Sequence, residues 1–264
     1  MEQQQNPMEQ PHKIESYQEI NSRTIDRWVE EGWEWGQPIS HEVYEKALHG
    51  EWSVVLTPTK PVPKHWLGDL RKKRILGLAS GGGQQGPVFH AAGAEVTILD
   101  YSEKQLETER MVASREGYEA ATVRADMTKP WPFPDESFDL IFFPVANCYI
   151  ESMEPVYTEA YRVLKPGGRL LSGLDNGFNF LFDEEDESRL SGYLPYNPLK
   201  NPSQMEELLA GDYGVQFSHS INDLVGGQIR AGFRLLDIYD DTNGSGLLHE
   251  HGAPCFYATL SLKD

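Results

Sequence analysis

The sequence predicts an α/β protein built on a doubly wound, mostly parallel sheet with helices on both faces. Two observations support this fold class. From Arg74 to Gly173, short apolar runs alternate with amphipathic segments, which is the pattern of strands that are each followed by a helix. The chain of 264 residues is also long enough for one domain of this kind with additions at its edges.

The beginning of the chain differs from this alternating centre. Residues 1–13 are rich in Gln, Glu and Pro, and we expect them to form a disordered tail. Residues 14–66 are predicted to be a helical cap, because apolar residues recur at helical spacing between Tyr17 and Leu48 and Ser40 can cap a second helix. The prolines of the Thr57–Pro63 segment then favour an extended connector.

The main domain is predicted to span residues 67–264. Its expected strands are Arg74–Ala79, Glu95–Leu99, Ala121–Arg124, Phe138–Val145, Arg169–Gly173, Phe233–Tyr239 and Cys255–Leu262. Its expected helices are Pro87–Ala92, Glu103–Glu116, Met153–Leu164 and Ser220–Ala231. Residues 176–214 lose this pattern and are interpreted as an insertion, in which the acidic run Asp183–Glu187 is expected to be a solvated loop.

Composition excludes several classes of function. With 23 basic and 41 acidic residues, the net charge of −18 repels phosphate, so neither nucleic acid nor an anionic membrane surface is expected as a partner. No run approaches the roughly 20 apolar residues of a membrane span, and the polar start lacks the features of a signal peptide, so we expect a cytoplasmic protein. Cys148 and Cys255 stand far apart, which predicts neither a disulfide framework nor a metal site.

The strongest chemical signal is a glycine-rich turn, ILGLASGGGQQG, which begins at Ile75 and is followed by a strand that ends at Asp100. Glycines let the backbone approach a ligand closely. An acidic residue about 20 positions further on, at the tip of the next strand, can accept hydrogen bonds from a ribose diol. Together these features predict a nucleoside site, although the spacing of small residues does not match the dinucleotide fingerprint cleanly.

Three later segments carry a resemblance to a known family. They are Ala125–Met127, the run WPFPDESFDLI at Trp131–Ile141, and the run AYRVLKPGGRLL at Ala160–Leu171. With the glycine turn they resemble the class I S-adenosylmethionine-dependent methyltransferases, in the branch that acts mostly on small molecules. The resemblance covers about Arg74 to Leu174. It implies a Rossmann-like sheet of seven strands, the last of them antiparallel, and S-adenosylmethionine as the cofactor.

The resemblance also assigns residues to the cofactor. It places Ala79, Ser80, Gly81, Gly82, Gly83 and Gln84 at the amino-acid end, Asp100 on the ribose, Tyr101 and Ser102 beside the adenosine, Asp126 and Met127 at the adenine, and Val145 and Asn147 in the reaction cleft. The sequence departs from the family pattern twice. Gly77 stands where an acidic residue is usual, and Ala79 stands where the first glycine of the turn is usual.

We therefore predict a methyltransferase that acts on an unidentified small-molecule acceptor, chosen by residues 14–66 and 176–232. If a general base is needed, the candidates are His41, His65 and His219, with Tyr149 as a polar alternative. His219 is favoured because it opens the late helix at the carboxyl side of the sheet, where ligands bind in such folds.

Some alternatives stay open at this point. Trp28, Trp33 and Trp35 are interpreted as core residues, with a lid over the cofactor as the alternative. The glycine turn and Asp100 can also serve an NAD-dependent oxidoreductase. A non-catalytic nucleoside-binding module is the other rival, and the altered positions Gly77 and Ala79 favour it.

Overall fold

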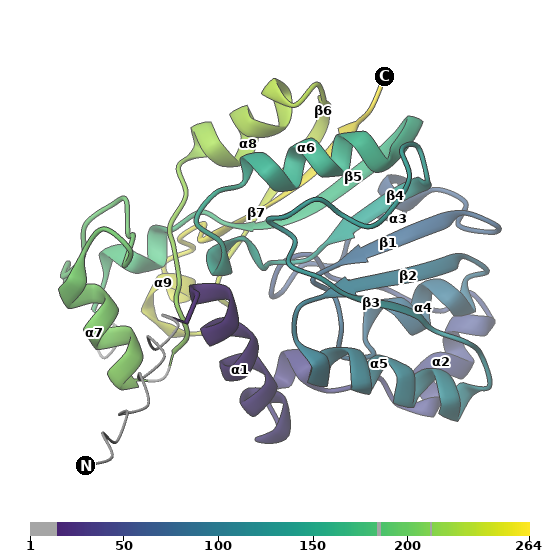
Figure 1. Ribbon diagram of the computed structural model, residues 1–264, viewed down its shortest axis with the longest axis horizontal. Helices are drawn as coiled ribbons and strands as arrows, with labels where there is room; N and C mark the ends of the chain where they lie inside the picture. The colour runs from purple at the N-terminus through teal and green to yellow at the C-terminus, as the bar shows by residue number, and fades with distance from the viewer. Residues whose placement is uncertain (1–14, 184–185, 212) are drawn as a thin grey trace, which may run out of the picture.

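The computed structural model describes residues 15–183, 186–211 and 213–264, so the predicted tail at residues 1–13 lies outside the described residues. Its centre is a sheet of seven strands in the order β3-β2-β1-β4-β5-β7-β6 (Figure 1). The strands are β1 Arg74–Leu78, β2 Glu95–Asp100, β3 Ala121–Arg124, β4 Phe138–Phe143, β5 Leu164–Asp175, β6 Arg234–Asp241 and β7 Phe256–Leu262. Only β7 runs antiparallel to its neighbours, β5 and β6. The predicted α/β fold is therefore confirmed.

Helices cover both faces of this sheet. They are α1 Tyr17–Glu30, α2 His41–Leu48, α3 Lys64–Leu67, α4 Gln85–Ala91, α5 Glu103–Glu116, α6 Glu154–Val163, α7 Pro202–Gly211, α8 Ile221–Arg230 and α9 Gly246–Glu250. Three short 3-10 turns are η1 Glu34–Gly36, η2 Asn147–Tyr149 and η3 Phe178–Leu181. In Figure 1, α6 and α8 lie over one face, and α2, α4 and α5 lie over the other.

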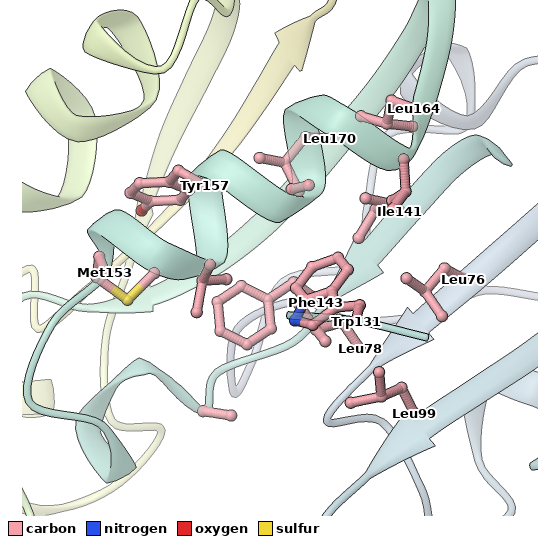
Figure 2. Packing of buried hydrophobic residues seen from close by; sticks show 14 of the residues in the cluster. Leu76, Leu78, Leu99, Trp131, Ile141, Phe143, Met153, Tyr157, Leu164 and Leu170 are labelled. Carbon is pink, nitrogen blue, oxygen red and sulfur yellow. The ribbon is translucent and has the colours of Figure 1, made fainter. Parts of the chain in front are cut away.

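Alternating side chains of the central strands fill the two layers between sheet and helices. On the α6 side, Leu76, Ile141 and Leu170 pack with Tyr157 of α6 (Figure 2). An adjacent residue on each strand points the other way: Ile75, Phe142 and Leu171 pack on the opposite face with residues of α2, α3 and α4. Because the central strands are buried on both faces, they form continuous apolar runs, as the sequence analysis assumed.

Local signals explain where several helices begin and end. Ser16, Ser40, Ser102 and Ser220 each accept a hydrogen bond from the backbone N–H three residues later, which satisfies a donor that the first turn leaves free. Helix α5 ends at Gly117, whose φ of 78° is accessible to glycine at low cost. These caps account for the agreement between the predicted and observed bounds of α5.

The predicted insertion at residues 176–214 contains regular structure that the sequence pattern did not indicate. Helix α7 lies within it, and an isolated bridge pairs Phe182 with Leu190. Strand β5 also begins at Leu164, five residues before its predicted start at Arg169, because Leu164 pairs with Phe138 of β4 ahead of an irregularity in the register. Within the acidic run, residues 184 and 185 lie outside the described residues, and the division of the chain at residue 66 stays a prediction.

Helix packing and hydrogen bonds hold the N-terminal segment against the main domain. Helix α1 packs against α5, and α2 packs against α4. The side chain of Asn21 on α1 donates to the carbonyls of Tyr149 and Val215, at 3.1 and 2.9 Å, and accepts from the Val215 N–H at 2.6 Å. These bonds fix α1 beside the carboxyl ends of the strands (Figure 1). None of the helices in the described ranges is both long and apolar enough to cross a membrane.

Candidate active site

A pocket of about 340 Å³ opens at the carboxyl ends of β1, β2, β4 and β5. This is the edge at which open α/β sheets bind ligands. Ten of the residues predicted from the sequence line it: Ala79, Ser80, Gly81, Gln84, Asp100, Tyr101, Ser102, Asp126, Met127 and Val145. Four do not line it: Gly82, Gly83, Asn147 and His219. The structure thus brings most of the predicted cofactor residues to one cavity.

Of the three consecutive glycines in the turn, Gly81 lines the pocket, and Gly82 and Gly83 do not. Ala79 has a φ of 47°, in the left-handed region that favours glycine, and its N–H donates to the Leu99 carbonyl at 2.7 Å. Gly82 and Gly83 are buried against α5 instead. The Gly82 N–H donates to the Gln105 carbonyl at 2.9 Å, and the Gly83 N–H donates to the Glu109 carboxylate at 3.0 Å. The later glycines therefore anchor the turn behind the pocket.

The departure at Gly77 has a steric reason. A Cβ atom at Gly77 would lie 2.3 Å from the Ser80 Oγ and 2.5 Å from the Ile98 Cδ1, both far below van der Waals contact. The Ser80 side chain thus occupies the space in which a residue at position 77 would place its own. The Ser80 Oγ is buried and has no hydrogen-bond partner in the described structure. Because a buried hydroxyl without a partner is costly, a polar ligand group in the pocket would satisfy it.

Asp100 connects the glycine turn to the start of α5. Its Oδ2 accepts from the Gly81 N–H at 3.1 Å, and its Oδ1 accepts from the Ser102 N–H at 3.0 Å. Burial raises the pKa of Asp100 to about 6, although these backbone hydrogen bonds oppose the shift. A carboxylate that lines the pocket at this strand end is a suitable acceptor for the two hydroxyls of a ribose.

The next part of the pocket lies beyond the ends of β2 and β3. Asp126 Oδ1 accepts from the N–H and hydroxyl of Thr128, at 2.8 and 2.7 Å, which fixes a tight turn. Trp131 Nε1 donates to the Met127 carbonyl at 3.0 Å. With Asp126 and Met127 held this way, Tyr101 lines the same pocket and adds an aromatic ring, a combination of polar and apolar groups that suits an adenine.

Tryptophans of the N-terminal segment close one side of the pocket. Trp33 and Trp35 line it, whereas Trp28 packs on Trp33 and Tyr149, with ring centroids 5.4 and 6.5 Å apart. Gln84 holds this segment in place, because its Nε2 donates to the carbonyls of Glu34 and Gln37 at 3.0 Å each. Trp33 and Trp35 thus form part of the pocket wall and Trp28 packs against Trp33, while a role as a lid over the cofactor stays a prediction.

The far end of the pocket holds a carboxylate that the sequence analysis missed. Asp175 is the last residue of β5 and lines the pocket together with Cys148, Tyr149 and Phe256. Its Oδ1 accepts from the Gly177 N–H at 2.7 Å, and desolvation raises its pKa to about 6. Its position directly after an apolar strand was a signal that could have found it, because parallel strands end at the ligand-binding edge.

Asn147 and His219 lie behind Asp175 and do not reach the pocket. The Asn147 side chain donates to the Asp175 carbonyl and accepts from the Asp175 N–H, both at 2.8 Å. His219 Nε2 donates to the Asn147 carbonyl at 2.9 Å, and burial lowers the pKa of this histidine. Since the ring is engaged away from the cavity, we do not propose His219 as a catalytic base.

The other candidate bases differ in their placement. His41 pairs with Glu116 at 2.7 Å on the protein surface, and His65 is likewise exposed. Tyr149 lines the pocket. No Lys, Arg or His is found among the pocket-lining residues of the described chain, whereas three carboxylates, those of Asp100, Asp126 and Asp175, line it. The pocket therefore favours neutral or cationic ligands over anionic ones.

Comparisons with known proteins agree with this geometry. Residues 76–172 match the family model described as a methyltransferase domain. A Bacillus subtilis (strain 168) protein described as the uncharacterized methyltransferase YbaJ is 45% identical over 249 residues, which cover 92% of this chain and 97% of that protein. A demethylmenaquinone methyltransferase of Thermus thermophilus is 38% identical over 101 residues, which cover 38% of this chain and 46% of that enzyme.

Solved structures share the fold. The crystal structure of an S-adenosylmethionine-dependent methyltransferase from Mesorhizobium loti superposes with a TM-score of 0.61 and 22% sequence identity. The match covers 76% of this chain and 95% of that one. At this identity, the likeness supports the order of the strands and the helices on both faces of the sheet.

Proposed function

The chain belongs to the class I S-adenosylmethionine-dependent methyltransferases, and from that premise we propose that its methyl acceptor is a small molecule bound beside Asp175. The supporting observation is the division of the pocket. Asp100 and the glycine turn lie at one end, and Asp175 with Tyr149 and Phe256 lies at the other. One cavity therefore offers places for a nucleoside cofactor and for a second molecule.

The residues present fit the cofactor. Asp100 supplies acceptors for ribose hydroxyls and Ser80 supplies an unpaired buried hydroxyl, while Gly81 lets the turn pack closely on α5, since a Cβ atom there would lie 2.6 Å from the Gln105 Cβ. S-adenosylmethionine supplies a methyl group that is already activated by its sulfonium. The chain therefore needs no covalent nucleophile; its residues orient the two partners and exclude water.

Water is excluded by the segments that close the pocket. Ser22 of α1 donates to the Tyr101 carbonyl at 2.9 Å, and Asp26 accepts from the Ser102 hydroxyl and from the Lys104 N–H. Ile25 of the same helix lines the cavity together with Trp33. Helix α1 is thus held over the cofactor end by polar bonds, while Gln18, Asn21, Ser22 and Ile25 face the cavity.

A small acceptor and a cytoplasmic location complete the proposal. The absence of basic side chains among the described pocket residues gives phosphate groups no counter-charge, which argues against nucleic acid as the acceptor. Both cysteines are buried free thiols, as expected for a reducing compartment.

Calorimetric titration tests the proposal. We expect the purified protein to bind S-adenosylmethionine and S-adenosylhomocysteine but not NAD. Incubation with a small-metabolite extract and methyl-labelled S-adenosylmethionine should then label a product of low mass. Binding of NAD in place of the two sulfur nucleosides, or label confined to macromolecules, would contradict it.

A further inference from the structure

The carboxylate of Asp175 has no basic partner among the residues that the structure describes. No ion pair joins it to a Lys, Arg or His in the described part of the chain, and none of these residue types lines the pocket there. Its hydrogen bonds come from the Gly177 N–H and the Asn179 side chain. A carboxylate removed from bulk water in this way is stabilised by any ligand that brings a charge-assisted hydrogen bond.

The residues that surround Asp175 also offer its carboxylate no charged hydrogen-bond donor. Burial raises the pKa of Cys148, Tyr149 and Cys255, and the nearby charge of Asp175 adds to each of these shifts. None of these groups carries a positive charge. Phe256, which is paired with Asp175 in the register of β5 and β7, and Val55 add apolar walls to the same part of the pocket.

From this arrangement we propose that Asp175 binds an N–H or O–H group of the methyl acceptor, and that the acceptor is therefore a neutral or cationic molecule such as an amine or an alcohol. This assignment rests on the proposed methyltransferase function. A carboxylate or phosphate on the acceptor would meet Asp175 without a counter-charge and be repelled. An ammonium group would form a charge-assisted hydrogen bond in a partly desolvated site, where such bonds are strong.

Asn147 and His219 are positioning residues for this group. The Asn147 side chain bonds both the N–H and the carbonyl of Asp175, and His219 holds the Asn147 backbone through its carbonyl. All three residues are brought together by the end of β5, the η2 turn and the segment before α8. The backbone of Asp175 is thus held in place by two side chains that do not enter the pocket.

Three probes with a common phenyl ring and two-carbon stem test the proposal: 2-phenylethylamine, 2-phenylethanol and 3-phenylpropionate. Each is titrated calorimetrically into the protein loaded with S-adenosylhomocysteine. We expect the amine to bind most tightly and the carboxylate most weakly. Asp175→Asn should weaken amine binding by about tenfold or more while leaving the dissociation constant of S-adenosylhomocysteine unchanged, which also shows that the variant folds.

Asp126→Asn is the matched control, because it removes the same charge from the other end of the pocket. We expect it to keep the preference for the amine. Equal binding of the three probes, no binding of any of them, or an unchanged preference in Asp175→Asn would overturn the assignment. A loss of S-adenosylhomocysteine affinity in Asp175→Asn would assign the carboxylate to the cofactor instead. Failure of the wild-type protein to bind S-adenosylhomocysteine would overturn the proposed function itself, and this assignment with it.

Discussion

The carboxamide of Asn147 bonds the peptide groups of Asp175 on both sides, one as donor and one as acceptor, at 2.8 Å each. The Asn147 side chain is fully buried, so neither bond is replaced by water when it is lost. The end of β5 therefore depends on one side chain from η2 for its position.

Replacing Asn147 with Ala should affect both stability and acceptor binding. We expect the free energy of unfolding to fall by about 2–4 kcal/mol, because two buried backbone groups lose their partners. Probe binding at Asp175 should weaken while S-adenosylhomocysteine binding persists at temperatures where the variant is folded. Urea denaturation and calorimetry measure the two effects. Asn222→Ala, on the exposed surface of α8, is the control and should change neither.

Replacing Asp100 with Ala should weaken cofactor binding. The loss of charge-assisted hydrogen bonds to the ribose is expected to cost about 1.5–3 kcal/mol, or about ten- to a hundredfold in the dissociation constant of S-adenosylhomocysteine. Asp100→Asn, which keeps one acceptor oxygen for the Gly81 or Ser102 N–H, should lose less. An unchanged constant in Asp100→Ala would remove the cofactor from this end of the pocket.

Gly77→Ala should destabilise the protein by about 1–3 kcal/mol, because the new methyl group overlaps the Ser80 Oγ and the Ile98 Cδ1. In a Ser80→Ala background the cost should be smaller, since the clash with the hydroxyl is gone. Urea denaturation of the wild type, Gly77→Ala, Ser80→Ala and the double variant gives the coupling free energy between the two positions directly. Additive effects would show that Ser80 does not occupy the space above Gly77.

The buried carboxyl group of Glu109 should make the stability of the folded protein depend on pH. Burial raises its pKa to about 7, above the value of 4.5 for an exposed glutamate, so the folded state binds the proton more tightly than the unfolded chain. This proton contributes stability that is fully present below about pH 4.5 and is lost as the pH rises to about 7.

Glu109→Gln keeps an oxygen for the Gly83 N–H and removes the titration. We expect it to be more stable than the wild type at pH 8, by about 1–3 kcal/mol, and to show little or no gain near pH 4.5. Denaturation with urea at the two pH values measures the difference. Glu107→Gln, exposed on the same helix, should show no such pH-dependent gain. A gain of equal size at both pH values would contradict a titrating Glu109.

The sequence predicts correctly those parts of the fold that depend on residues close together in the chain. The bounds of α5 follow from the Ser102 cap and from Gly117, and both lie within the segment itself. Helix α7 escaped prediction because it is short, follows a segment rich in Pro and Asn, and buries only Leu208, so no apolar face marks it in the sequence.

The candidate site shows the same difference between local features, which the sequence reveals, and contacts between distant segments, which it does not. Asp100 could be predicted from its spacing to the glycine turn, whereas the roles of Asn147 and His219 could not. Both residues carry polar groups that suit a ligand, but each bonds a backbone group 28 or 72 residues away in the chain. Only the convergence of η2, β5 and the segment before α8 shows that they face each other and leave Asp175 in the pocket.

Part of the pocket lies outside the stretch that matches the methyltransferase domain. That stretch, residues 76–172, contains Asp100 and residues 79–84 of the glycine turn. Val55, Asp175 and Phe256, in the part of the pocket proposed for the acceptor, lie outside it. Substitutions at these outer positions can therefore retune which molecule receives the methyl group without disturbing its donor, so lineages that inherit the same donor site are free to diverge in their acceptors.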